Sequence, residues 1–248
     1  MRERGTAAML RAMADKIQST MDGRVLRIKL DDGKANTIEA RWVVELGAAL
    51  DVAERDAGAV LLEGRQGRFC AGLDLKILPT LGRDRLVAFV RDYQQLMLRL
   101  FLFPRPVVCA IGGHAIAGGA VLALASDLRI MAEGTFHIGL REVAIGIPLP
   151  TFGCELAKAT LPPTSWTGAV LRGELYVPSV AHTKGMVDRV VPASALTELA
   201  LAEARAMSML PDVAFAKTKG MLRAEFATRI EAASEGDLSA LAVGIPFD

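Results

Sequence analysis

The residues best suited to chemistry in this sequence lie in two glycine-containing loops. The first is Phe69–Lys76 (FCAGLDLK), and the second surrounds the adjacent glycines Gly118 and Gly119. Glycine has no Cβ, so the backbone at these positions can approach a ligand closely. The second loop also opens an alanine- and leucine-rich segment that predicts a helix. The first N–H groups of a helix lack intrahelical partners and, aided by the helix dipole, suit an anion or a developing oxyanion.

Each loop alone also fits a simpler interpretation, a tight turn whose glycines let a buried helix pack against a strand. The pair of loops favours a shared site, because each loop follows a buried strand and precedes a helix. Two N–H groups from separate loops can converge on one carbonyl oxygen. Such donors stabilise the negative charge of a thioester enolate.

Strand and helix patterns alternate along the chain as far as about residue 191. Thr37 is a candidate N-cap for the first predicted helix, which ends near Gly58. Beyond Pro192, two long segments are strongly helical. This order predicts an α/β core followed by a helical C-terminal region. The predicted strands are 24–30, 59–62, 107–111, 128–131 and, with its turn, 185–191; the later helices are 86–102, 120–125, 154–159, 196–209 and 213–233.

The bulk composition fits a globular protein with a substantial core. The 248 residues suit one large domain, and 29 Lys plus Arg against 28 Asp plus Glu give a net charge of +1. That balance removes the usual argument for nucleic acid or a membrane surface as partner. No apolar run reaches about 18 residues, so no transmembrane helix is expected. We expect no signal peptide and, over residues 1–20, a weakly ordered extension.

The three cysteines, Cys70, Cys109 and Cys154, lie in apolar surroundings and show no CxxC spacing. No histidine or carboxylate stands at metal-ligand spacing from them. This pattern argues against a disulfide framework and against a metal site. A reducing cytoplasm is therefore the simplest location.

Three motifs together resemble the enoyl-CoA hydratase/isomerase (crotonase) superfamily. They are AGLDLK at 71–76, GHAIAGG at 113–119 and EVAIG at 142–146, and the resemblance runs from about Val25 to the C-terminus. It implies a crotonase-like fold of repeated ββα units over 21–191 and a helical trimerisation region over 192–248. It also implies an acyl-CoA thioester as substrate and a homotrimer or dimer of trimers. No metal or redox cofactor is implied, because coenzyme A enters with the substrate and the thioester is the electron sink.

The motif positions carry over to individual residues of this chain. The oxyanion donors that the resemblance implies are the backbone N–H groups of Leu73 and Gly118. Ala71 would lie against the adenine of coenzyme A and Lys76 near its phosphates, with Lys34 assisting from the turn before the first helix. Both lysines also fit an alternative role as solvated surface amines.

One departure from the family pattern decides which reaction is expected. Hydratases of the family resemble one another in having a glutamate shortly after the glycine pair and another further along the chain. The first position here is Val121, which cannot transfer a proton, and the second falls at Glu142. The segment IGLRE at 138–142 resembles the IGLNE segment of the mitochondrial Δ3,Δ2-enoyl-CoA isomerases, with Arg141 in place of asparagine.

A single carboxylate suffices for isomerisation. Glu142 would remove a C2 proton from a 3-enoyl-CoA and return it to C4, giving the conjugated 2-enoyl-CoA. An apolar wall that includes Val121 would exclude water and raise the pKa of the glutamate. His137 would also line the acyl pocket. The alternative role for Glu142 is a structural salt bridge with Arg141 or a neighbour.

These observations together predict an enoyl-CoA isomerase. The first alternative is an enoyl-CoA hydratase or another lyase or hydrolase of the family, because one oxyanion site serves any enolate or tetrahedral intermediate. The second alternative is a non-catalytic acyl-CoA-binding protein.

Overall fold

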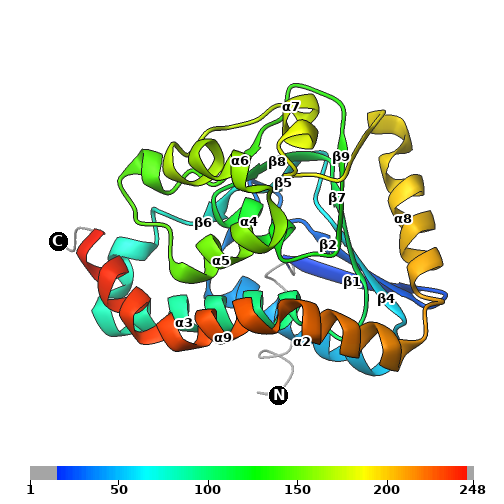
Figure 1. Ribbon diagram of the computed structural model, residues 1–248, viewed down its shortest axis with the longest axis horizontal. Coiled ribbons are helices and arrows are strands. Elements are labelled where there is room, and N and C mark those ends of the chain that lie inside the picture. The colour runs from blue at the N-terminus through cyan, green and yellow to red at the C-terminus, as the bar shows by residue number, and fades with distance from the viewer. Residues whose placement is uncertain (1–15, 245–248) are drawn as a thin grey trace, which may run out of the picture.

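The structure, a computed structural model, describes residues 16–244 (Figure 1). Residues 1–15, most of the extension predicted over 1–20, lie outside the described residues. Strand β1 (Ile17–Asp22) begins the main sheet, so the predicted boundary after residue 20 falls inside a strand and is wrong. The strand escapes notice in the sequence because it is an edge strand on which only Ile17 is fully buried. Within 16–244, no helix is long and apolar enough to cross a membrane.

Six strands form the main sheet, in the order β1-β2-β4-β7-β9-β11. Strand β2 pairs antiparallel with β1, and all the other neighbours are parallel. Every residue of β4 and β7 is buried, as is typical of parallel strands covered on both faces. The bounds are Val25–Leu30 (β2), Ala59–Glu63 (β4), Val107–Ile111 (β7), Leu128–Ala132 (β9) and Arg189–Val191 (β11).

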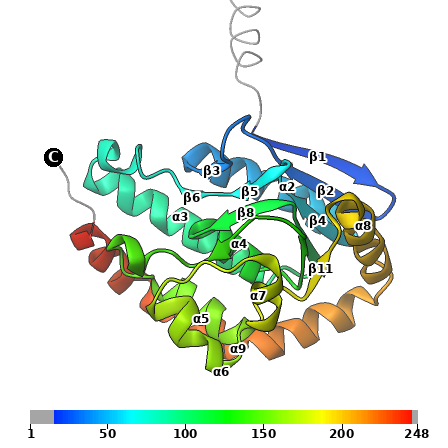
Figure 2. The ribbon, with the colours of Figure 1, turned by 90° about the horizontal axis from the view of Figure 1, so that it is seen from above.

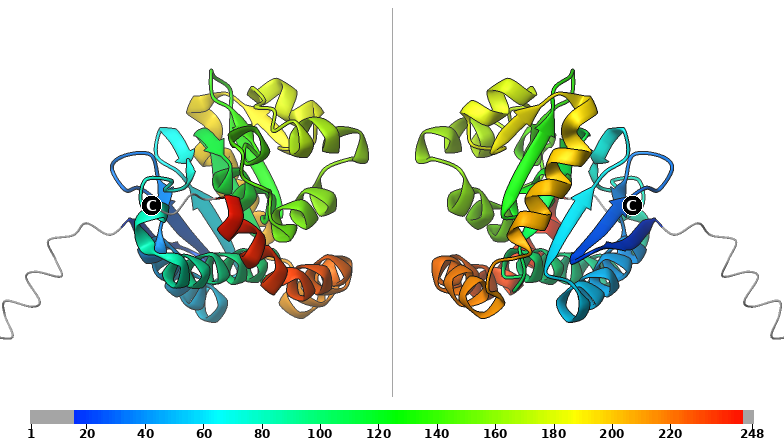
Figure 3. Two further views of the ribbon diagram at one scale, coloured as in Figure 1. Left: turned by 90° about the vertical axis from the view of Figure 1, so that its left-hand side faces the viewer. Right: turned by 90° about the vertical axis from the view of Figure 1, so that its right-hand side faces the viewer.

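Side chains alternate between the two faces of these strands, which divides the core into two clusters. On one face, Val25, Leu61 and Val108 pack in a cluster with α8 (Leu196–Met207), the helix that crosses the strands in Figure 3. Three further helices cover the other face: α2 (Ala40–Asp56), α3 (Arg83–Phe101) and α4 (Gly118–Leu124).

Short strands that follow the main strands carry both glycine loops. Strands β5 (Gly67–Cys70), β8 (Gly113–Ile116) and β10 (Ile138–Gly139) form a second parallel sheet, and β3 (Thr37–Ile38) pairs with β6 (Gly72–Leu73). The strand pairs β4–β5 and β7–β8 are followed by α3 and α4 respectively. The repeated ββα units and the α/β fold class predicted from the sequence are confirmed.

The N-cap predicted at Thr37 is wrong. Thr37 belongs to β3, its N–H donates to Asp32 Oδ2 at 3.2 Å, and α2 begins only at Ala40. Pairing with β6 holds the backbone extended at this point, so a tertiary contact outweighs the local capping preference.

The C-terminal region is helical, as predicted. Helix α9 (Asp212–Gly244) runs beside α3 and α5 (Thr151–Thr160), as Figures 1 and 2 show. Lys219 of α9 pairs with Asp127 at 2.8 Å and so fastens this helix to the start of β9. The shorter helices are α6 (Pro163–Trp166), a π-helical segment Thr167–Leu171, α7 (Pro178–Thr183) and the 3₁₀ turns Leu78–Leu81, Val143–Ile145 and Ala193–Ala195.

Candidate active site

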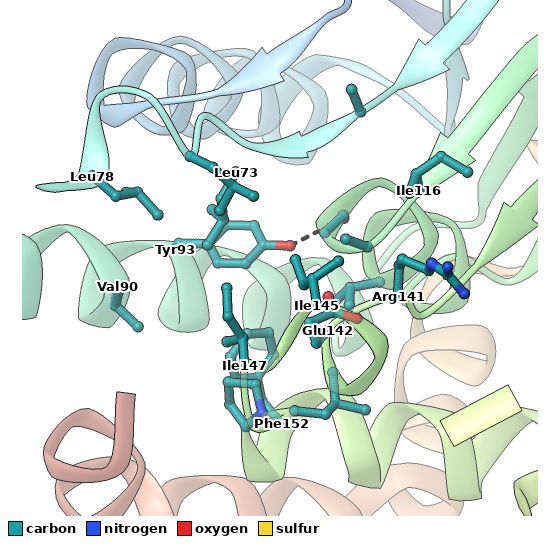
Figure 4. Close-up of a pocket in the computed structure, with 17 residues that line it drawn as sticks. Leu73, Leu78, Val90, Tyr93, Ile116, Arg141, Glu142, Ile145, Ile147 and Phe152 are labelled. Atoms are coloured by element: carbon teal, nitrogen blue, oxygen red, sulfur yellow. Dashed lines mark hydrogen bonds between the residues drawn. The ribbon is translucent and has the colours of Figure 1, made fainter. Parts of the chain in front are cut away.

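Both glycine loops border one cavity of about 240 Å³. It lies between α3, the start of α4 and the loop that follows β10 (Figure 4). Tyr93, Arg141 and Glu142 are the polar side chains among the described residues that line it. The rest of its wall is apolar and is made mainly by Leu78, Val90, Ile116, Ile145, Ile147 and Phe152.

The second loop holds Gly118 in place through a strained alanine. Ala117 has φ 52° and ψ −120°, a backbone conformation that favours glycine. Its N–H donates to Gly139 O at 2.8 Å, and its carbonyl accepts hydrogen bonds from Ala120 N at 2.8 Å and Val121 N at 3.0 Å. These bonds fix the turn, so that Gly118 begins α4 with an N–H group that has no intrahelical partner.

The backbone of the first loop packs against the backbone of the second at Gly72 and Gly118. Asp74 N–H donates to Ile38 O at 3.1 Å, and successive N–H groups of a strand point to opposite sides, so the N–H of Leu73 points away from β3. A methyl group on Gly72 would lie only 2.9 Å from the nitrogen of Gly118. The structure therefore brings together the two loops in which the sequence predicted a shared site.

Glu142 enters the same cavity from the loop after β10. Its carbonyl accepts hydrogen bonds from Ile145 N at 3.1 Å and Ile147 N at 3.0 Å, which hold the turn that carries it. Its carboxyl oxygen Oε2 is buried and has no hydrogen-bond partner among residues 16–244. Burial raises the pKa of this carboxyl group from its ordinary 4.5 to about 7.

Arg141 does not neutralise this carboxyl group. Its Nη1 donates to Gly173 O at 2.9 Å, and within the described part of the chain Glu142 forms no ion pair. The structural salt bridge considered as an alternative for Glu142 is therefore not formed with Arg141. An unpaired carboxyl group with a pKa near neutrality can both remove and return a proton.

Comparison with known proteins now identifies the family. Residues 20–243 match the family model described as enoyl-CoA hydratase/isomerase. The chain belongs to this family. It is 31% identical over 215 residues to the human mitochondrial enoyl-CoA delta isomerase 1, covering 85% of this chain and 71% of that protein. It is 33% identical over 208 residues to a putative enoyl-CoA hydratase of Thermus thermophilus, covering 82% and 81%.

The fold agrees with this assignment. The structure matches that of the human mitochondrial delta3-delta2-enoyl-CoA isomerase with a TM-score of 0.89 and 29% identity, over 93% of this chain and 92% of that one. The protein is thus a crotonase-family acyl-CoA enzyme. Relatives named as isomerases and as hydratases are about equally similar to it, so the reaction has to be argued from the residues of its own site.

In this family member, several residues predicted from the motifs lie at or near the cavity. Val121 is buried and lines it, and Ala71 lies on its wall. Lys34 and Lys76 are exposed, and Lys76 directly follows Leu75, which lines the cavity. Their backbones are fixed by neighbours: Arg65 Nη1 donates to Lys34 O at 3.1 Å, and Lys76 N–H donates to Asp74 Oδ1 at 3.1 Å.

The placement of His137 in the acyl pocket is wrong. Its ring stacks on His114 with ring centroids 5.6 Å apart and planes 10° from parallel, and it lines a separate depression together with Glu133 and Val177. His137 comes directly before β10, and Glu142 follows this strand. Although the two residues are near each other in sequence, only Glu142 lies at the cavity.

Two aromatic residues of the cavity were not identified as site residues from the sequence. Tyr93 is 2% exposed and lies on α3, where its helical spacing indicates only a core position. Phe152 lies at the start of α5 and packs edge-on against Tyr93. No local motif marks either residue, because each reaches the cavity by long-range packing.

The described residues contain no group of three or more His, Cys, Asp or Glu side chains that could hold a metal ion. The three cysteines are free, and burial raises the pKa of the Cys70 and Cys109 thiols to about 12. Neither thiol is therefore set up as a nucleophile.

Proposed function

We propose that this protein is a Δ3,Δ2-enoyl-CoA isomerase with Glu142 as its acid/base group. The observation that carries the proposal is the Glu142 carboxyl group, buried in an apolar cavity with a pKa of about 7. It is the only carboxyl group among the described residues that line the cavity, and Val121 stands where a second would serve to activate water. An isomerase needs one such group, whereas a hydratase of this family needs two.

The proposed reaction begins with the thioester oxygen against the N–H groups of Leu73 and Gly118. These donors stabilise the negative charge that develops when ionised Glu142 removes the C2 proton. The charge spreads through the adjoining double bond to C4, and the protonated Glu142 returns the same proton there. A pKa near 7 suits both steps, because the group acts first as a base and then as an acid. The apolar wall keeps water away from the dienolate.

We also propose where coenzyme A lies. Ala71, on the wall of the cavity, would contact the adenine, and Lys34 and Lys76 would act as point charges near the phosphates. Support comes from the exposure of both side chains and from their places in the chain. Lys76 follows Leu75 of the cavity wall, and Lys34 precedes Ala35, whose carbonyl accepts a hydrogen bond from Ala71 N at 3.2 Å. A nucleotide bound there would leave the acyl chain inside the apolar cavity.

Conversion of 3-hexenoyl-CoA tests the proposal, since the conjugated product absorbs in the ultraviolet. Glu142→Gln keeps the shape of the side chain but cannot transfer the proton, and we expect kcat/KM to fall about 10²- to 10⁴-fold. Glu198→Gln makes the same chemical change at an exposed position of α8 and should leave the rate unchanged.

Two other results would contradict the proposal. Efficient hydration of 2-hexenoyl-CoA by the wild type would show that a second proton donor exists despite Val121. Tight binding of the ester without any turnover would instead indicate a non-catalytic acyl-CoA-binding protein.

We further propose a homotrimer or dimer of trimers in the cytoplasm. Apolar side chains stand exposed by 68–74% around the α8–α9 junction and on α9, which supports burial of this surface in an assembly: Met209, Val213, Met221 and Leu222. The free cysteines suit a reducing compartment. Light scattering of the purified protein measures the mass of the assembly.

A further inference from the structure

Tyr93 carries a hydroxyl group that the proposed reaction does not use. The side chain points from α3 into the cavity, and its hydroxyl lies 3.1 Å from the carbonyl oxygen of Gly118 (Figure 4). The ring is held from the side by Phe152, whose centroid is 5.6 Å away with the planes at 81°. The phenol is thus fixed at both its ring and its oxygen.

The direction of this hydrogen bond is determined by the two groups. A carbonyl oxygen can only accept, so the Tyr93 hydroxyl must donate to Gly118. Burial raises the pKa of the Tyr93 phenol well above its ordinary value of 10, so the proton stays on the oxygen throughout the physiological range. The donor is therefore permanent.

Gly118 is a residue that needs an external support. It has no side chain of its own to pack, and it follows the strained Ala117. A methyl group on Gly118 would lie 3.0 Å from the Tyr93 oxygen, so this oxygen occupies the side of Gly118 on which a side chain would project. The Gly118 N–H shares a peptide plane with the Ala117 carbonyl, which Ala120 N and Val121 N hold, and the Tyr93 hydroxyl holds the next plane through the Gly118 carbonyl. The chain is therefore fixed on both sides of the Gly118 Cα.

We propose that Tyr93 is a positioning residue, whose hydroxyl holds Gly118 so that the Gly118 N–H points at the thioester oxygen of the bound acyl-CoA. The inference rests on the proposed use of Gly118 as an oxyanion donor. Tyr93 touches no reacting atom in this role. It acts through Gly118, in the way that preorganised donors gain their effect from not having to move during the reaction.

Tyr93→Phe removes the hydroxyl and keeps the ring that packs on Phe152. Loss of one neutral hydrogen bond that aligns the donor should lower kcat for 3-hexenoyl-CoA about tenfold and leave KM within about twofold. The matched control is Tyr176→Phe, which removes the hydrogen bond from the Tyr176 hydroxyl to Glu174 Oε2 at 3.0 Å, away from the cavity. The control should leave both constants unchanged.

A second measurement observes the oxyanion contact without any turnover. Bound [1-¹³C]hexanoyl-CoA, a saturated ester that cannot isomerise, should show a thioester carbonyl stretch lower in frequency than in solution, because hydrogen bonds weaken the C=O bond. In Tyr93→Phe this frequency should move back toward the solution value, while in Tyr176→Phe it should not. Infrared difference spectra of the labelled and unlabelled ester give the frequency.

The outcomes separate this inference from the proposed function. A wild-type protein that shows no isomerisation but whose lowered carbonyl frequency is lost in Tyr93→Phe would overturn the isomerase and support the role of Tyr93. Tyr93→Phe with unchanged kcat and unchanged carbonyl frequency would overturn the role of Tyr93 and leave the isomerase intact. A change confined to thermal stability or to KM would also overturn it, because it would reveal a structural role only.

Discussion

Two regions of this molecule bury a carboxyl group. One region surrounds it with cations, and the other, within the described part of the chain, leaves it without a cation. Beside β9, Asp127 accepts hydrogen bonds from Val107 N–H at 2.8 Å and Lys219 Nζ at 2.8 Å, and it pairs with Arg223 at 2.9 Å. In the cavity, the Glu142 carboxyl group is buried with no cation among residues 16–244 to pair with it. One carboxylate has its charge matched, and the other is left to be neutralised by a proton.

The difference follows from what each group does. Opposite charges favour the ionised form of a carboxylate, which suits a permanent link between α9 and the sheet. An acid/base group has to exist in both forms near neutral pH, and a neighbouring lysine or arginine would prevent this. A cation paired with Glu142 would therefore stabilise the fold but would keep the carboxyl group ionised, so that it could no longer act as an acid.

The largest expected effect tests the structural side of this comparison. Asp127→Ala leaves Lys219 and Arg223 buried without a counter-charge, since their side chains are only 5% and 15% exposed. We expect the free energy of unfolding to fall by about 3–5 kcal/mol. Urea titration followed by circular dichroism measures this change.

The control for this variant is Asp56→Ala at the end of α2. Asp56 pairs with Arg55 at 3.0 Å, but both side chains are largely exposed, so the loss should stay within about 0.5 kcal/mol. Equal effects of the two substitutions would show that burial of the Asp127 cluster does not matter, and the comparison would fail.

The next largest effect concerns Glu142 in the cavity, whose contribution to the free energy of unfolding should depend on pH. The pKa of Glu142 is raised from 4.5 in the unfolded chain to about 7 in the folded protein, so the folded state binds the proton more tightly. Its contribution to stability is fully present below pH 4.5 and is lost as pH rises toward 7. The loss amounts to about 3 kcal/mol. Glu142→Gln cannot ionise and should lack this dependence.

Unfolding free energies of wild type and Glu142→Gln at pH 5 and pH 8 measure the difference. We expect Glu142→Gln to gain stability over wild type at pH 8, and to gain much less at pH 5. The same ionisation should make kcat/KM of the wild type rise as pH increases through about 7, because the base has to be unprotonated. A stability difference that does not change with pH would mean that Glu142 titrates like an exposed glutamate.

The two regions also differ in how far the sequence predicts them. Leu73, Gly118 and Glu142 were named from short motifs, because each motif encodes its own turn and the recognised fold brings the turns together. The Lys219–Asp127 pair was not predicted, since it joins residues 92 positions apart. Tyr93 was assigned only to the core, because helical spacing cannot distinguish a cavity wall from a packed interior. His137 was placed wrongly because it lies only five residues before Glu142 in the sequence, whereas strand β10 between them carries the two residues to different places.

The smallest expected effect concerns strain near the site. Ala117, with φ 52°, holds an unfavourable backbone conformation next to the proposed oxyanion donor, whereas α4, which begins directly after it, is regular. Ala117→Gly should relieve this strain and, after the greater entropy of glycine in the unfolded chain, raise the unfolding free energy by about 1 kcal/mol. The measurement is the same urea titration.

An alanine inside α4 provides the control for this change. Ala120→Gly, at a regular and buried position of α4, should instead lower stability by about 1 kcal/mol. Opposite signs for two identical substitutions three residues apart would locate the strain at Ala117 itself. If both variants lost stability, the backbone conformation of Ala117 would not lower the stability of the fold. The unpaired carboxyl group of Glu142 would then be the remaining unfavourable feature that distinguishes the cavity from the Asp127 cluster.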